Sequence, residues 1–127
     1  MGAFYTEATL THHVHRKRTR KVPKLLVATG SEYTWIHAAT LEALGVTREK
    51  KDLSFVLANG QTVTRSVGFA ILRVDSHFTI DEVIFAEPGD LELLGTRTLE
   101  GLGLVPDPRR KKLVASGPLP AAGSDEP

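Results

Sequence analysis

The chain has 127 residues, no cysteine and a formal net charge of +1, from 16 basic and 15 acidic residues. This length suffices for one compact domain but is short for two. The absence of cysteine excludes disulfides, thiolate metal sites and a cysteine nucleophile. Balanced charge, and the lack of a long apolar run or a signal-peptide pattern, lead us to expect a cytoplasmic protein without nucleic-acid or membrane partners.

Strand-like segments separated by turn residues dominate, so we predict a mainly β domain over residues 1–115. Residues 4–11 alternate in the manner of a strand, and a basic polar segment follows at 12–24. Residues 25–27 are typical of a short buried strand. Together these segments are expected to form a hairpin with a long tip.

Residues 38–44 place apolar side chains near helical spacing, and Gly45 supplies a stop, which predicts a short helix. The Asn59-Gly60 pair lies between β-favouring runs at 54–57 and 62–67, and Asn-Gly in that position is a strong hairpin signal. The pattern therefore predicts a protruding hairpin.

Two further strands are expected at 68–74 and 78–85, turning through 75–77. Residues 96–102 are expected to form one or two helical turns, ending at Gly101 or Gly103. A last strand at 111–115 precedes residues 116–127, where Gly, Pro, Ala and acidic residues leave little to bury. We expect that tail to be disordered.

The stretch 25–31 reads Leu-Leu-Val-Ala-Thr-Gly-Ser and resembles the apolar-apolar-Asp-Thr-Gly signature of aspartic proteases, with Ala28 at the aspartate position. In such a signature the glycine lets the chain turn tightly behind the acid, and the hydroxyl of Thr29 can lock the turn by a hydrogen bond. With an acid at position 28, the segment would read Val-Asp-Thr-Gly-Ser.

Aspartic protease chemistry requires two carboxylates that share one proton: the ionised one activates water and the protonated one polarises the scissile carbonyl. The chain holds a single signature and has no room for a second lobe. A two-fold homodimer would supply both acids, because it places the same loop of each subunit across the axis.

Residues 4–114 resemble the retropepsin-like aspartic proteases in order. The resemblance implies a small closed, mainly antiparallel β-barrel with one or two short helices, a dimer built from the terminal strands, and neither metal nor cofactor. It places Ala28, Thr29 and Gly30 at the catalytic loop. It implies substrate contacts from Ser31, from the flap and from the apolar-apolar-Gly segment before the second helix. These contacts would come from Ala58, Asn59, Gly60, Gln61 and Leu94.

Ala28 leaves no carboxyl to hold or activate water, so this form is expected to be inactive as an endopeptidase. Three explanations stay open: an Asp-to-Ala change that prevents self-cleavage, a natural pseudoenzyme, or a chance match to the remaining motif. Glu32 lies beyond the turn and is expected to point elsewhere. The alternative function is a non-catalytic module that holds a peptide or protein segment in the same cleft.

Three other features have competing interpretations. His13 and His15 share one face of a strand as a metal pair would, but no third ligand is evident, which favours solvated histidines. The basic residues of segment 12–24 lack interleaved aromatic residues, which favours a solvated hairpin tip over a nucleic-acid site. They include Arg16, Lys17, Arg18, Arg20 and Lys21. Trp35 is either a core aromatic or a wall of the substrate pocket, with the core favoured.

Overall fold

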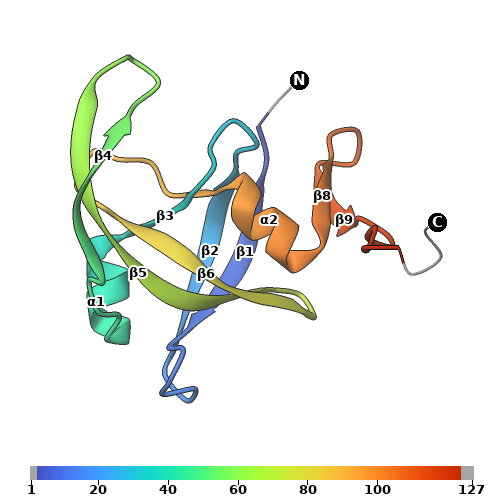
Figure 1. The fold of residues 1–127 in the computed structure, drawn as a ribbon, viewed down its shortest axis with the longest axis horizontal. Coiled ribbons are helices and arrows are strands. Elements are labelled where there is room, and N and C mark those ends of the chain that lie inside the picture. The colour runs from blue at the N-terminus through green and yellow to red at the C-terminus, as the bar shows by residue number, and fades with distance from the viewer. Residues whose placement is uncertain (1–2, 124–127) are drawn as a thin grey trace.

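A computed structural model describes residues 3–123 (Figure 1). The strands are β1 (Tyr5–Thr11), β2 (Thr19–Val27), β3 (Thr34–His37), β4 (Lys50–Val56), β5 (Thr62–Val74), β6 (His77–Ala86), β7 (Leu93–Leu94), β8 (Leu104–Asp107) and β9 (Lys112–Ala115). The helices are α1 (Ala38–Leu44) and α2 (Thr96–Leu102). The prediction of a mainly β domain with two short helices is confirmed.

Seven strands form one mixed sheet in the order β1-β2-β7-β3-β6-β5-β4. An additional antiparallel pairing joins β1 to β5, with Leu10 opposite Leu72, so the sheet curls into a near-closed ring and β4 lies outside it. The β2–β7 and β3–β6 pairs are parallel, and the remaining pairs are antiparallel. A near-closed ring leaves few unpaired backbone groups along its strands.

Both helices have the predicted bounds, and a glycine terminates each of them. Gly45 and Gly103 adopt left-handed conformations at the C-caps, with φ of 88° and 73°. Their N–H groups bond back to carbonyls of the last helical turn, which satisfies otherwise unpaired acceptors. Of the two predicted stops for the second helix, Gly103 is the one used.

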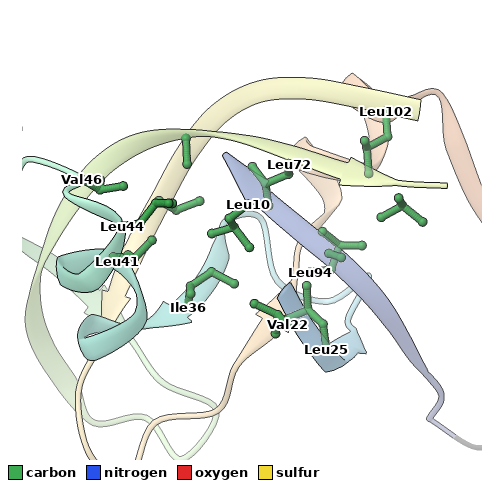
Figure 2. Packing of buried hydrophobic residues seen from close by; sticks show 14 of the residues in the cluster. Leu10, Val22, Leu25, Ile36, Leu41, Leu44, Val46, Leu72, Leu94 and Leu102 are labelled. Atoms are coloured by element: carbon green, nitrogen blue, oxygen red, sulfur yellow. The ribbon is translucent and has the colours of Figure 1, made fainter. Parts of the chain in front are cut away.

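The main core fills the ring with aliphatic side chains from both helices and most strands (Figure 2). Leu10, Leu25, Ile36 and Leu94 are completely buried there. Figure 2 shows Leu41 and Leu44 pointing from α1 toward this cluster. Each buried side chain of this size contributes about 1.5–3 kcal/mol to folding, so the core is the main source of stability.

Two predicted strands, 62–67 and 68–74, are one continuous strand, β5, of 13 residues. Gly68 does not break it, because the glycine serves close packing: a Cβ there would lie 2.5 Å from the Thr47 carbonyl oxygen and 2.6 Å from Val46 Cγ1. The following turn is shorter than predicted, since β6 begins at His77 and the turn comprises Asp75 and Ser76.

The C-terminal strand β9 was predicted, but its antiparallel partner β8 was not. Figure 1 shows this small hairpin beside α2, away from β4. Residues 116–123 are exposed and form neither helix nor strand, and residues 124–127 of the predicted tail lie outside the described residues. No helix within residues 3–123 is long and apolar enough to cross a membrane.

The strand expected at 25–27 is longer than predicted, because residues 19–22 pair with residues 8–11 of β1. The hairpin tip, expected over 12–24, is therefore a loop of residues 12–18.

This loop is built around the buried side chain of His12. Its Nδ1 accepts hydrogen bonds from the N–H groups of Val14 and His15, at 3.1 and 3.0 Å. The neutral ring therefore carries its proton on Nε2, which donates to the Gly45 carbonyl at 3.2 Å. Burial lowers the pKa of His12, because the charged ring would lose its hydration.

We predict that His12 makes folding pH-dependent. In the unfolded chain its pKa stays near 6.5, whereas the folded value is lower. As the pH falls below about 6.5 the unfolded state therefore binds the proton first, and the free energy of unfolding decreases until the folded pKa is passed. His12→Asn keeps an acceptor near the Nδ1 position but cannot titrate. Chemical denaturation from about pH 7 to about pH 5 should show a flatter decline for this variant.

His77→Asn, which removes a histidine outside this loop, is the matched control and should retain the original pH dependence. An unchanged slope in His12→Asn would contradict the assignment.

Candidate functional site

The turn that resembles the protease signature, Ala28-Thr29-Gly30, lies where the short strand β7 is inserted between β2 and β3. Leu26 and Val27 pair in parallel with Leu93 and Leu94, and Trp35 pairs with Leu93 in the antiparallel sense. The loop that joins β2 to β3, residues 28–33, must therefore pass over β7. Figure 1 shows this loop on the same side of the molecule as the tip of the β4–β5 hairpin.

Backbone hydrogen bonds hold the turn against β7. The N–H of Ala28 donates to the Leu94 carbonyl at 3.0 Å, and the N–H of Ser31 donates to the Ala28 carbonyl at 3.2 Å. The Ser31 hydroxyl donates to the Tyr33 carbonyl at 3.0 Å. The turn is thus fixed from both ends.

The first turn of α2 completes this attachment. The N–H groups of Thr96 and Arg97 donate to the carbonyls of Ser31 and Glu32, at 2.8 and 3.0 Å. The Thr96 hydroxyl donates to the Thr29 carbonyl at 3.0 Å. The expected lock from the Thr29 hydroxyl is not among the hydrogen bonds of the described residues; the hydroxyl comes from Thr96 instead.

The two glycines of this region have different roles. A Cβ at Gly95 would lie 2.3 Å from the Tyr33 carbonyl oxygen and 2.8 Å from that of Glu32, so only glycine lets the loop approach β7. Gly30 does not have a positive φ, and nothing in the chain lies within 4 Å of its Cβ position. Within one chain, therefore, no local geometry requires a glycine at position 30.

A buried polar chain supports the turn from beneath. The N–H of Gly95 donates to Thr34 Oγ1 at 2.9 Å, Thr34 and Thr98 share a 2.6 Å hydroxyl contact, and Thr98 donates to Asp81 Oδ2 at 2.9 Å. Both threonines are completely buried. Because Thr98 donates to Asp81, it accepts from Thr34. Both threonine hydroxyls therefore have a hydrogen-bond donor and an acceptor as partners.

A cleft of about 1020 Å³ opens beside the turn. Ala28, Gly30 and Ser31 line one side, and Ala58 and Asn59 from the β4–β5 hairpin line another. Most other lining side chains are apolar or aromatic, as in peptide- and ligand-binding clefts. They include Leu26, Tyr33, Trp35, Leu53, Phe55, Val56, Leu57, Leu91 and Leu93.

The base of the cleft is a second, smaller cluster of buried residues that includes Trp35, Val67 and Ile84. Phe55 meets the rings of Tyr33 and Trp35 edge to face, with centroids 5.7 and 5.4 Å apart. These contacts join the β4–β5 hairpin to the loop 28–33. Trp35 is therefore both a core residue, at 8% exposure, and a wall of the cleft.

The predicted Asn59-Gly60 hairpin is confirmed. The N–H of Leu57 donates to the Gln61 carbonyl and that of Gly60 to the Leu57 carbonyl, both at 2.8 Å. Asn59 Oδ1 accepts from the N–H of Gln61 at 2.9 Å, and Gly60 adopts a positive φ of 84°. A turn closed by its own side chain projects a defined tip over the cleft.

Two carboxylate residues line the cleft, and they differ in their surroundings. Asp90 forms a bidentate pair with Arg65, at 2.7 and 2.8 Å, and this contact holds the pKa of Asp90 below its ordinary value. Glu32 is exposed and also lines the cleft, contrary to the expectation that it points elsewhere. Position 28 itself offers only a methyl group.

Ion pairs behind the loop connect three elements. Glu82 on β6 contacts Lys50 of β4 at 2.7 Å and Arg97 of α2 at 3.3 Å. The guanidinium of Arg97 lies 4.7 Å from the ring centroid of Tyr33, a cleft residue. Glu82 raises the pKa of Lys50 by hydrogen bonding and charge. These contacts link Tyr33, which lines the cleft, to β4 through Arg97, Glu82 and Lys50.

The structure brings together most, but not all, of the residues expected at the site. Thr29, Gly60 and Gln61 belong to the two turns without lining the cleft. Leu94 is completely buried and points into the core (Figure 2), and its neighbour Leu93 lines the cleft instead.

Sequence reasoning missed the aromatic and aliphatic wall contributed by β4. Leu53, Phe55 and Leu57 are partly buried and alternate with exposed residues, so period-two alternation was the available signal. No group of three or more His, Asp or Glu residues within residues 3–123 is arranged to hold a metal ion.

No protein-family model matches the chain, and a search of curated proteins finds no similar sequence.

We predict that Gly95→Ala destabilises the domain by about 2 kcal/mol or more, because the new methyl group must displace the Tyr33 backbone. Gly30→Ala is the matched control, with open space and no positive φ, and should change the free energy of unfolding by less than about 0.5 kcal/mol. Denaturant titration of both variants measures the difference. Equal stabilities would contradict the close packing of β7 against the loop.

Thr98→Val tests the buried polar chain. The substitution conserves shape but leaves the Thr34 hydroxyl and Asp81 without their partner, so we expect a loss of about 1–3 kcal/mol in unfolding free energy. Thr62→Val, at an exposed position of β5, provides the control. A Thr98→Val variant as stable as this control would show that the network adds nothing to folding.

Proposed function

We propose that this chain has the architecture of a homodimeric aspartic endopeptidase of the retropepsin type, with a closed β-barrel subunit and one signature turn per subunit. Position 28 is the place of the catalytic aspartate, and the Ala28 form binds but does not cleave peptides. The observation that carries the proposal is the position of the Ala28-Thr29-Gly30 turn beside a largely apolar cleft that the β4–β5 hairpin also lines.

The rigidity of the turn supports a catalytic role. Hydrogen bonds from β7 and α2 fix residues 28–32, so a carboxylate at position 28 would be held in place before substrate arrives. Fixed groups lower the cost of orienting reactants, which is a major source of rate enhancement. A solvated surface turn would not need attachments at the carbonyls of Thr29, Ser31 and Glu32.

Charge considerations favour a second copy of the chain. The reaction needs two carboxylates close enough to share a proton, and Asp90 is occupied by Arg65. Thr29 and Gly30 are exposed, and no atom of the chain lies within 4 Å of the Gly30 Cβ position. This open side of the turn leaves room for the same turn of a partner across a two-fold axis.

In the proposed complex the substrate is an extended peptide between the paired turns and the Asn59 hairpins. Its main chain would bond to exposed backbone groups of the hairpin, and its side chains would enter the apolar wall formed by Tyr33, Trp35 and Phe55. With aspartate at position 28, one carboxylate would take a proton from water while the other donates to the scissile carbonyl. The pH profile would be bell-shaped and highest at acidic to near-neutral pH.

Ala28 also favours a second candidate function, a peptide-binding module without catalysis. The cleft, the hairpin and the attachments of the turn are intact although the acid is missing. Binding requires only these parts. The two functions differ in whether an acid at position 28 produces cleavage.

Ala28→Asp is the decisive change. We expect the variant to cleave a mixed peptide library at least about a thousandfold faster than the unaltered chain, because the catalytic carboxylate is the missing group. Mass spectrometry of the products measures cleavage, and sedimentation measures the dimer. The rate per subunit should fall when the protein is diluted below its dimer dissociation constant.

Ala28→Asn is the control, since it has similar volume but no acid, and it should stay inactive. Glu32→Gln in the Ala28→Asp background should retain cleavage, whereas loss of cleavage would indicate an acid pair within one chain. A folded Ala28→Asp dimer that cleaves nothing but still binds peptides would favour the binding module. A strictly monomeric chain would overturn the homodimer.

A further inference from the structure

The β1–β2 hairpin concentrates positive charge in its loop, residues 12–18, and in the part of β2 that follows it. Residues 12–24 hold six of the 16 basic residues and none of the 15 acidic residues. The basic side chains are all exposed. They are Arg16, Lys17, Arg18, Arg20, Lys21 and Lys24. The net charge of +1 is therefore the sum of a strongly cationic segment, residues 12–24, and a remainder with more acidic than basic residues.

None of these six cations forms an ion pair with an acid of the described residues. Every ion pair found within residues 3–123 involves basic residues outside segment 12–24. Three of the cations bond or stack locally: Arg16 with the His13 carbonyl, Arg20 with the Thr19 carbonyl, and Lys24 over the Tyr5 ring. None of these contacts cancels charge, and of the six cations Lys21 shares a surface hollow with the acids Glu7 and Asp75. The loop therefore has a net positive field.

The tip has a defined shape. His12 Nδ1 binds two N–H groups of the loop, the N–H of His12 donates to the Arg18 carbonyl, and the N–H of Arg18 donates to the His15 carbonyl. The side chain of Val14 is held at 63% exposure within this cationic loop. Contact with phosphate groups does not remove an exposed valine from water. Insertion into the boundary of a lipid layer does, and this transfer is favourable.

We propose that this loop docks the protein peripherally on a bilayer that contains anionic lipids. The five cations of residues 16–21, in the loop and at the start of β2, would face the negatively charged headgroups, and Val14 would enter the interface between them. Lys24 lies over Tyr5 at the other end of the hairpin and would not take part. Nucleic acid is the less favoured partner, because the loop is a convex projection and because the position of Val14 has no use in phosphate binding. The sequence-based expectation of no membrane partner used the balanced net charge and the lack of an apolar span, whereas this proposal uses the uneven distribution of charge along the chain.

Figure 1 places this loop at the opposite end of the molecule from the tip of the β4–β5 hairpin. Docking through the loop would therefore leave the cleft open to solvent and to peptides. This inference does not rely on the proposed protease function, since it uses none of the cleft residues.

The test is sedimentation of the whole chain with vesicles of phosphatidylcholine alone and with about 30 mol% phosphatidylserine. We expect binding only to the anionic vesicles, falling steeply between about 0.05 and 0.5 M NaCl. The triple variant Lys17→Gln, Arg20→Gln and Lys21→Gln should bind roughly a hundredfold more weakly. Val14→Ser should bind more weakly by up to about tenfold at unchanged charge.

The matched control is the triple variant Arg109→Gln, Lys111→Gln and Lys112→Gln, which makes the same change in net charge at exposed residues around the β8–β9 turn. It should bind within about twofold of the unaltered chain. Equal losses in both triple variants would overturn the proposal, because they would indicate an effect of net charge alone. Absence of binding to anionic vesicles at low salt would overturn it as well. Tighter binding to a nucleic-acid duplex than to vesicles, unaffected by Val14→Ser, would replace the bilayer with nucleic acid.

Discussion

β7 contributes only two residues to the sheet, yet it pairs with β2 on one side and with β3 on the other. Those two strands are consecutive in the chain, so their connecting loop has to cross the end of β7. Gly95 lets the crossing occur at van der Waals contact, and the following turn of α2 binds the loop carbonyls. The shape of the turn, the direction of α2 and the position of Tyr33 in the cleft all depend on this insertion.

The sheet has two apolar faces where β3 pairs with β6. Ile36 and Phe85 point into the main core, whereas Trp35 and Ile84 belong to the smaller cluster below the cleft. Alternation along a strand makes this possible, because successive side chains leave opposite faces. The same short segments thus stabilise the domain and form the base of its candidate binding site. A strand that is apolar on both faces needs cover on each face. On the cleft side of β3 that cover includes Leu53 and Phe55 of β4.

Local signals in the sequence predicted the local elements well. Both helices and the Asn59 hairpin are encoded by a few neighbouring residues, with glycine supplying each stop or turn. The local signals do not give pairings between distant segments: the β1–β5 pairing, the parallel partners of β7, and β8. The resemblance implied a closed sheet but not which strands meet to close it. The runs 62–67 and 68–74 were expected as separate strands, and the reason for Gly68 within one continuous strand, the close approach of Thr47, is visible only in three dimensions. Likewise, the motif identified the turn at Ala28, but only the pairing of β7 decides that Leu93, rather than Leu94, reaches the cleft.

β5 runs without interruption from the Asn59 hairpin to the Asp75 turn, and near its end it pairs with the part of β1 that leads into the basic loop. At the usual rise per residue, its 13 residues give a contour of roughly 43 Å. Because β5 is continuous between the two ends, we expect it to act as a rigid spacer. If the β1–β2 loop is anchored to a surface, the cleft would be held at a fixed distance and angle from that surface. Only peptides that extend to this distance would reach the cleft.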